Sequence, residues 1–215
     1  MTRASTRTDR PTSGPACIGL TGGIGSGKTA ALAAFARRGA AVLSSDEVVH
    51  RLYADPDVVS AVVGRFGNGV LGADGTVDRG AVGERAFTDD ADLAFLEGLL
   101  HPRIGAERTA WVAGQRTATP PPPVLVCEVP LLFEVGLADQ FDAVVVVTAP
   151  EAVRRVRVED RGQQYDARRA HQVDEAAKVA RADMAYVNDG SLMDLDAWVG
   201  RVMHRYGHGA SDGAS

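Results

Sequence analysis

Eight consecutive residues near the N-terminus form the clearest chemical pattern in the chain. Residues 22–29 fit the sequence G-x-x-x-x-G-K-[S/T], which is typical of a phosphate-binding loop. Glycines let the backbone turn tightly enough to aim successive amide N–H groups at phosphate oxygens, and a following helix adds the positive end of its dipole. A strand-like run at residues 17–21 and a helical run from residue 30 disfavour a glycine-rich turn that binds nothing. The sequence therefore predicts binding of a nucleoside triphosphate.

Two side chains of this loop have chemistry of their own. Lys28 can reach the β- and γ-phosphates, and the Thr29 hydroxyl can bind Mg²⁺. The backbone amides are expected to surround the phosphate oxygens together with the first turn of the helix. The nucleotide-binding residues expected on this basis are Gly22, Gly23, Ile24, Gly25, Ser26, Gly27, Lys28, Thr29 and Ala30.

Two carboxylates follow predicted strands and are candidates for chemistry beside the loop, because ligands meet the carboxyl ends of parallel strands. Asp46 lies just past the run at residues 40–44, where it could accept the proton of an attacking hydroxyl. A helix N-cap is an equally supported interpretation of Asp46. Glu128 lies at the end of the run at residues 124–129 and could orient Mg²⁺ through water. A carboxylate tied to a backbone N–H is the alternative for Glu128.

Histidine and arginine side chains add further candidates. His101 precedes a proline in a long helical region, where a lone histidine is more often structural than functional. Four arginines follow one another closely in and just after a later helix, at Arg154, Arg155, Arg157 and Arg161. They exceed what a solvated helix face needs, and we expect at least one to neutralise charge on the triphosphate. Their spacing leaves open which one does so.

Composition limits the class of protein. The chain has 215 residues, of which 45% are hydrophobic and 24% are charged, as is ordinary for a globular protein. Its net charge of −5 argues against nucleic acid as the main partner. Cys17 and Cys127 lie in apolar runs and are expected to be core thiols of a cytoplasmic protein. No apolar run in the sequence approaches the length of a membrane span.

The elements that must position these residues alternate between strand and helix. This alternation predicts an α/β fold with a parallel sheet covered on both faces. Strands are expected at residues 17–21, 40–44, 124–129, 143–148 and 184–187. Helices are expected at residues 28–38, 46–53, 79–87, 92–115, 151–159 and 192–206.

Two stretches interrupt this alternation. Residues 54–116 contain no clear strand pattern and are too long for a crossover loop, which predicts a helical insertion. The four prolines at residues 120–123 are expected to form a stiff spacer that leads the chain back to the sheet. Residues 160–181 are polar and basic and are expected to form a lid. The predicted organisation is a nucleotide-binding core at 16–53, 124–158 and 184–206, an insertion at 54–123, a lid at 159–183, and disordered tails at 1–15 and 207–215.

Several motifs, taken in order, resemble the dephospho-CoA kinase family over about residues 17–205. Residues 20–29 are similar to the family's N-terminal signature, and Asp46 after the second strand is similar to its acidic segment. Residues 75–79 and 100–102 follow the family's order in the insertion. Residues 130–134 resemble its P-L-L-F-E segment, and the closing pattern is matched at Gln172, at residues 181–183, at Asn188 and at residues 190–192.

The resemblance implies a P-loop kinase-type three-layer fold with a helical substrate-domain insertion and a short lid. It implies that ATP with Mg²⁺ phosphorylates the ribose 3′-hydroxyl of dephospho-CoA, the last step of coenzyme A synthesis. It also implies a small-molecule substrate, no nucleic acid or membrane partner, and a monomer or weak homo-oligomer in the cytoplasm.

The resemblance also assigns roles to particular residues. Asp46 would be the catalytic base, and the acceptor side would include His101, Phe133 and Glu134. The ATP site would gain the lid arginines Arg157 and Arg161 and a base contact from Asn188, although Asn188 equally suits an Asn-Asp-Gly turn.

Two departures from the family pattern accompany these expectations. Ser44 stands where the family often has a second Asp, and fewer residues than expected separate Arg161 from Gln172. Another small-molecule P-loop kinase, acting on a nucleoside or metabolite, would share every phosphate-side residue, and only residues 75–102 and 130–134 argue against it. A switch GTPase is disfavoured because the sequence lacks an N-K-x-D motif.

Overall fold

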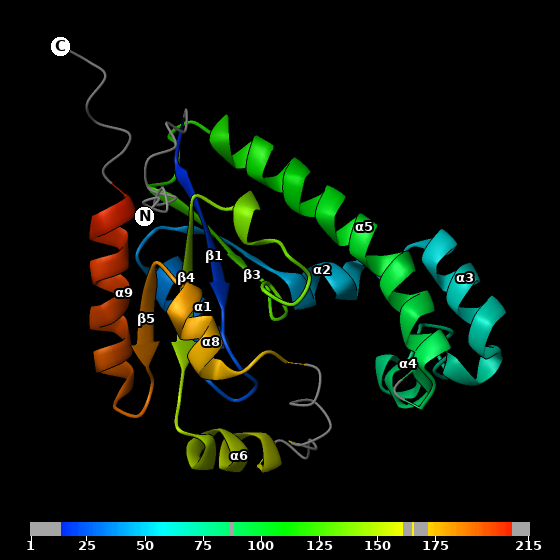
Figure 1. Ribbon diagram of the computed structural model, residues 1–215. Helices are drawn as coiled ribbons and strands as arrows, with labels where there is room; N and C mark the ends of the chain where they lie inside the picture. Colours follow the sequence, from blue (N-terminus) through cyan, green and yellow to red (C-terminus); the bar gives the residue numbers. More distant parts are fainter. Residues whose placement is uncertain (1–13, 87, 161–164, 166–171, 208–215) are drawn as a thin grey trace, which may run out of the picture. The chain divides into compact units, whose positions relative to one another are not determined.

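The computed structural model describes residues 14–86, 88–160, 165 and 172–207. Its five-stranded sheet has the order β2-β3-β1-β4-β5 (Figure 1). Strand β1 pairs in parallel with β3 and β4, and β4 pairs in parallel with β5, so the predicted parallel sheet is confirmed. The strands are β1 (Ala16–Thr21), β2 (Ala41–Ser44), β3 (Val124–Glu128), β4 (Ala143–Thr148) and β5 (Met184–Val187).

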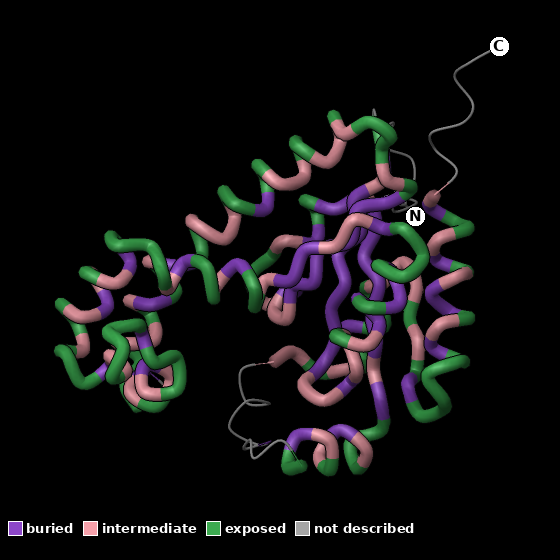
Figure 2. Tube along the Cα trace, turned by 180° about the vertical axis from the view of Figure 1, so that it is seen from behind, coloured by how far each residue is buried: buried purple, intermediate pink, exposed green. Residues whose placement is uncertain are grey.

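The central strands are apolar along almost their whole length because both of their faces are covered. Every residue of β3 is buried, and so are the first five residues of β4. In Figure 2 the buried residues are concentrated along these strands. Edge strand β5 instead alternates between half-buried and exposed residues, which is the pattern of a strand with one covered face.

One face of the sheet packs against α1 (Lys28–Arg37) and α9 (Leu192–Tyr206). The core there contains Phe35 of α1 and Trp198 of α9, whose rings meet edge to face with centroids 6.4 Å apart. Tyr186 of β5 stacks on Trp198 at a centroid distance of 5.4 Å. These aromatic contacts fix both helices and the edge strand on the same core.

The other face is covered by the chain that follows β3. Gly19 of β1 lies against Leu132 and Phe141, which are both buried. Side chains alternate along a strand, so this contact is on the face opposite the one where Ile18 and Leu20 join the α1–α9 core. The remaining elements of this part of the chain are η3 (Ala138–Gln140), α6 (Glu151–Glu159) and α8 (Glu175–Arg181), and α8 packs on β4.

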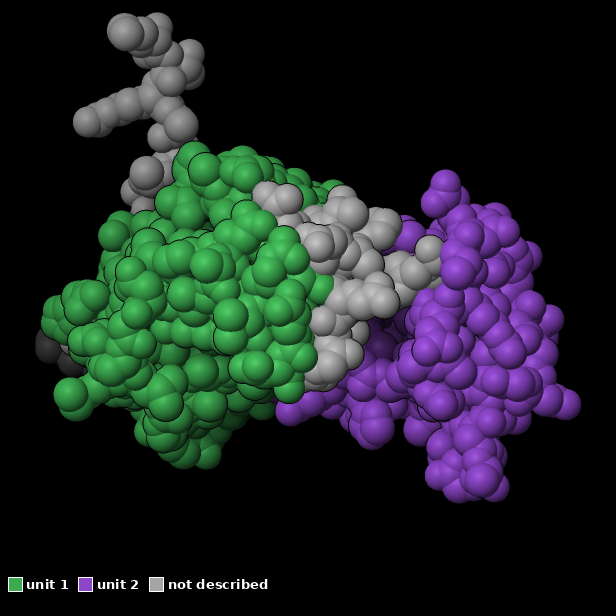
Figure 3. All heavy atoms as spheres, turned by 90° about the horizontal axis from the view of Figure 1, so that it is seen from below, with its two compact units in different colours: residues 1–43, 112–215 green, residues 44–111 purple. Residues whose placement is uncertain are grey.

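The chain divides into two compact units, residues 1–43 with 112–215 and residues 44–111 (Figure 3). The second unit is helical in its described part, as expected for this stretch, apart from an isolated bridge between Leu71 and Val77. Its small core includes Val58, Val62, Val70, Val82 and Leu96. Its elements are α2 (Ser45–Leu52), α3 (Pro56–Phe66), η2 (Asn68–Val70), α4 (Arg79–Ala86) and most of α5 (Asp90–Arg116). The insertion boundaries 54–123 stay a prediction.

Candidate active site

The phosphate loop joins β1 to α1, as the sequence predicts. Gly22 has φ 151°, and a Cβ atom there would overlap the carbonyl oxygen of Val147 in β4. The loop therefore begins in direct contact with a neighbouring strand, at a position that no larger residue fits. Gly27 is the N-cap residue of α1 and has no side chain that could accept a capping hydrogen bond, and the first turn of α1 contains no acidic residue. The positive end of the helix dipole is thus left for an anionic ligand.

Lys28 lies at the start of α1 and folds back onto its own loop. Its Nζ donates to the carbonyl oxygens of Gly22 and Gly23, each at 3.0 Å. Thr29, the next residue, is exposed. Both residues therefore lie at the end of the loop where phosphates bind in this motif.

Asn188 and Arg157, which are far from the phosphate loop in sequence, contact its backbone. The buried Asn188 side chain donates through Nδ2 to the Ser26 carbonyl at 2.8 Å, and its backbone N–H donates to Thr148 at 2.7 Å. Arg157 of α6 donates to the Gly25 and Asn188 carbonyls, each at 3.3 Å. Both residues contact the loop backbone, and the expected base contact from Asn188 stays a prediction. Arg161 lies outside the described residues.

Two further residues near the loop, Gln172 and Glu175, were not assigned to the site from sequence, and Arg154 was only one of four arginine candidates for the triphosphate. Gln172 accepts the backbone N–H of Ile24 through Oε1 at 3.0 Å. Glu175 lies so close to Gly23 that a Cβ atom there would overlap its carboxylate, which also accepts the Thr148 hydroxyl. The buried Arg154 donates through Nε to the Ala149 carbonyl at 2.9 Å, and its Nη1 also approaches Gly23. Two sequence signals pointed to this region: the position of Gln172 in the closing pattern, and the inclusion of Arg154 among the four arginines of which at least one was expected to contact the triphosphate.

The carboxylates Asp46 and Glu128 lie in different settings. Asp46 is exposed in the first turn of α2, and the N-cap residue of this helix is Ser44, so the interpretation of Asp46 as an N-cap is wrong. Glu128 is buried at the end of β3 and pairs in register with Leu20, two residues before the phosphate loop. It therefore reaches the rim of the sheet where the loop begins.

The acceptor-side candidates fall in both units. His101 is exposed in the middle of α5, within residues 44–111. Phe133 is buried, and the guanidinium of Arg181 lies 4.4 Å from its ring centroid. Glu134 is not free, because its Oε1 accepts the Val173 N–H at 2.8 Å and lies 2.8 Å from the ammonium of Lys178.

Residues 16–194 match the profile of the family described as dephospho-CoA kinase. The chain belongs to the dephospho-CoA kinase family. One relative, the dephospho-CoA kinase of Frankia casuarinae, is 41% identical over 86% of this chain and 81% of its own. The family assignment rests on sequence along most of the chain, including both the phosphate loop and residues 75–102 and 130–134.

Solved structures support the fold of this family member. A Thermus thermophilus protein of known crystal structure aligns with a TM-score of 0.74 and 30% identity over 89% of this chain and 98% of its own. The dephospho-CoA kinase of Campylobacter jejuni aligns with a TM-score of 0.60 over 89% of this chain and 97% of its own. Because that pair is only 21% identical, it bears on the fold alone. The predicted α/β, P-loop kinase-type fold is confirmed.

Proposed function

We propose that this protein transfers the γ-phosphoryl group of ATP to the ribose 3′-hydroxyl of dephospho-CoA and so produces coenzyme A. The observation that carries the proposal is the family match over residues 16–194, which spans the loop and the acceptor segments together. The enzyme is a kinase, and its protein groups need mainly to align the two substrates and stabilise charge on the transferred group.

On the ATP side, the loop amides of residues 22–29 hold the phosphates, with Ala30 in the first turn of α1 behind them. Lys28 exchanges its two carbonyl acceptors for β- and γ-phosphate oxygens, since an ammonium gains more from an anion than from neutral carbonyls. Arg157 holds the loop in shape through the Gly25 carbonyl. Arg161 is proposed as the lid arginine over the triphosphate, and Asn188 is proposed to contact the nucleotide base.

A magnesium ion fits the donor groups of this site. Among the described residues no cluster of three His, Cys, Asp or Glu side chains could hold a metal. Mg²⁺ in kinases uses few protein ligands, because phosphate oxygens and water complete its octahedron. The exposed Thr29 hydroxyl and, through water, Glu128 are the groups that would hold it. When bound, Mg²⁺ neutralises charge on the β- and γ-phosphates.

On the acceptor side, Asp46 is the proposed base. Its exposed carboxylate takes the proton of the 3′-hydroxyl as the oxygen attacks the γ-phosphorus and the bond from phosphorus to ADP breaks. His101 and Phe133 are proposed to line the dephospho-CoA side, with Glu134 behind them. No helix in the described ranges is both long and apolar enough to cross a membrane. We propose a cytoplasmic enzyme, monomeric or weakly self-associating, without a nucleic-acid partner.

Purified protein incubated with Mg·ATP and dephospho-CoA tests the proposal. The expected result is a coenzyme A product that carries the new phosphate on the 3′-oxygen, resolved by mass spectrometry and ³¹P NMR. A panel of nucleosides and other alcohols, assayed at matched concentration, distinguishes another metabolite kinase. Faster phosphorylation of a panel member than of dephospho-CoA would contradict the proposed substrate.

A further inference from the structure

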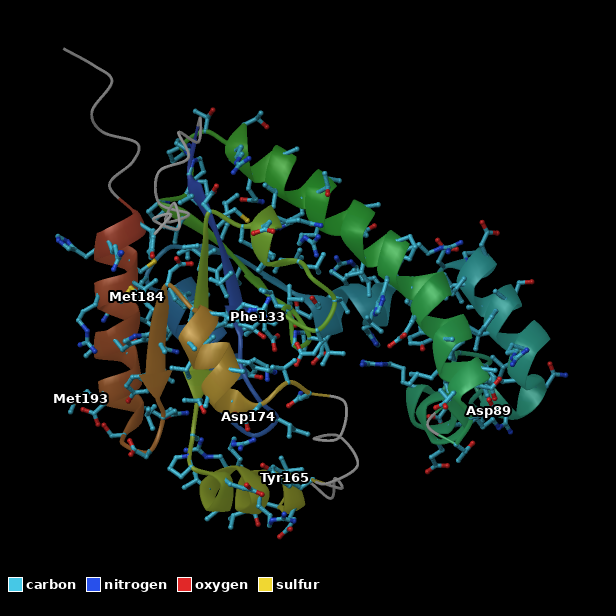
Figure 4. All side chains as sticks on the ribbon, viewed as in Figure 1. Asp89, Phe133, Tyr165, Asp174, Met184 and Met193 are labelled. Atoms are coloured by element: carbon cyan, nitrogen blue, oxygen red, sulfur yellow. The ribbon has the colours of Figure 1, made fainter. Side chains whose placement is uncertain are left out.

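Residues 172–183, here called the α8 segment, begin at the phosphate loop. Gln172 accepts the Ile24 N–H at 3.0 Å. Three residues further on, at the start of α8, the Glu175 carboxylate lies against Gly23. Asp174, labelled in Figure 4, accepts the Ala176 N–H at 2.9 Å and so caps α8 between these contacts. The position of α8 is therefore set directly by the loop.

The same segment also holds the residues that follow β3. The Lys178 ammonium lies 2.8 Å from Glu134 Oε1, which also accepts the Val173 N–H at 2.8 Å. Phe133, labelled in Figure 4, lies under the guanidinium of Arg181 at 4.4 Å. Three residues of the α8 segment thus contact residues 133–134, so this acceptor-side segment is connected to the phosphate loop through α8.

The central contact of this connection is a buried ion pair. The Lys178 side chain is fully buried, and only 12% of the Glu134 side chain is exposed. A buried ion pair stabilises a fold little more than an apolar pair of the same volume does, because both charges lose their hydration. The pair instead fixes the positions of the two side chains, since neither charge can separate from its partner and be hydrated. Glu134 is therefore engaged by the protein and is not free to bind a ligand through Oε1.

The choice of basic residue supports a positional role. The chain contains 23 basic residues, and all except Lys28 and Lys178 are arginines. Arginine presents a broad planar fork, whereas lysine presents a compact ammonium. In a chain whose other basic residues are arginines, lysine occurs at the phosphate loop and at the buried pair, where the Lys178 side chain is fully buried.

We propose that Lys178 is a positioning residue, which acts through Glu134 to fix residues 133–134 relative to the phosphate loop for transfer to the acceptor. The proposal rests on the proposed function, and it goes further by replacing a substrate contact of Glu134 with a contact inside the protein. Breaking the pair should misplace the acceptor segment while the contacts of Gln172 and Glu175 continue to support the ATP side.

A double-mutant cycle tests this role. Lys178→Met and Glu134→Gln should each lower kcat/KM for dephospho-CoA by about 30-fold or more, while the Kd of ATP changes by less than about threefold. The double variant should be no slower than the worse single variant, because both substitutions remove one interaction. The double variant also leaves no unpaired buried charge, so it should be thermally more stable than Lys178→Met. If Lys178→Met folds poorly, kcat/KM can therefore still be measured on the double variant.

An exposed ion pair gives the matched control. Arg37 lies 3.2 Å from Asp196, which also pairs with Arg38 at 2.5 Å, and the cycle of Arg37→Met with Asp196→Asn should leave kcat/KM within about twofold of wild type. Folded Lys178 variants with wild-type acceptor kinetics would overturn the proposal, as would additive effects or an equal loss of ATP affinity. Turnover of dephospho-CoA by the wild type in the same assay tests the proposed function separately. If the wild type phosphorylates a different alcohol, the expected ratios of variant to wild-type kcat/KM apply to that alcohol.

Discussion

The two side chains expected to take part in catalysis, Lys28 and Asp46, differ in their hydrogen bonding and exposure. Lys28 is bonded to two carbonyls of its own loop, whereas Asp46 is exposed in the first turn of a helix whose N-cap is another residue. A ligand can therefore recruit Lys28 by exchanging acceptors, and Asp46 can receive a proton without giving up a capping bond. Each arrangement leads to a measurable expectation.

Asp46→Asn should abolish most turnover and leave ATP binding intact. An amide cannot accept the hydroxyl proton, so kcat should fall by roughly 10²- to 10⁴-fold, while the Kd of ATP measured by titration calorimetry stays unchanged. Glu47→Gln is the matched control, because Glu47 is the next residue in the same turn and is also exposed. Near-normal phosphorylation of dephospho-CoA by Asp46→Asn would remove the assignment of the base.

Lys28→Ala should damage both binding and chemistry. Loss of the ammonium removes a charge-assisted contact to the β- and γ-phosphates that strengthens as charge develops in the transition state. We expect kcat to fall about 10²- to 10³-fold and ATP affinity to weaken, as measured by single-turnover kinetics and titration. A variant that retains wild-type kcat would show that the loop amides alone neutralise the transferred group.

Among the elements, several helices begin at a side chain that caps their first turn. α8 is capped by Asp174, and α9 begins with a capping box in which the Ser191 hydroxyl accepts the Asp194 N–H at 3.2 Å and the Asp194 carboxylate accepts the Ser191 N–H at 2.9 Å. α3 carries an equally clear start signal, Asp55 followed by Pro56, that was not singled out from sequence. Helix α2 starts one residue before its predicted start, and its N-cap residue is Ser44, the last residue of β2, whose side chain makes no capping hydrogen bond.

The capping box of α9 should make stability depend on pH. The hydrogen bond from the Ser191 side chain, followed by that from its backbone, lowers the pKa of Asp194 below the ordinary 3.8. A carboxyl whose pKa is lowered on folding stabilises the fold above its unfolded pKa, and this contribution is lost as pH falls through the folded pKa. Ser191→Ala should therefore lower Tm by a few degrees at pH 7 and by less near pH 2, in thermal scans at both values. An equal decrease at both pH values would contradict the role of the Asp194 charge.

At the scale of the whole molecule, the sheet was predictable and the assembly of the site was only partly so. β1, β3 and β4 are continuous apolar runs because they are covered on both faces, and such runs stand out in a sequence. The contact of Gln172 with Ile24 joins residues 148 positions apart, and the Lys178–Glu134 pair depends on how α8 packs. Local patterns cannot specify such pairings, because they follow from packing of the finished sheet.

Nucleotide binding should stabilise the molecule through the phosphate loop. A ligand that binds only the folded state at about 100 times its Kd adds about 2.7 kcal/mol to the free energy of unfolding. Mg·ATP should therefore raise Tm in a concentration-dependent way, measured by differential scanning fluorimetry, and Lys28→Ala should shift this response to higher ATP concentration. A Tm that does not respond to ATP would contradict nucleotide binding by the folded protein.

The scarcity of lysine has a practical consequence for spectroscopy. The Lys178 side chain is fully buried, whereas Lys28 is only half-buried at the phosphate loop. Reductive methylation with ¹³C-formaldehyde should therefore tag a single lysine of the folded protein, and that methyl resonance would report occupancy of the loop as nucleotide is titrated. The unmutated enzyme thus contains its own reporter for each step of loading and release.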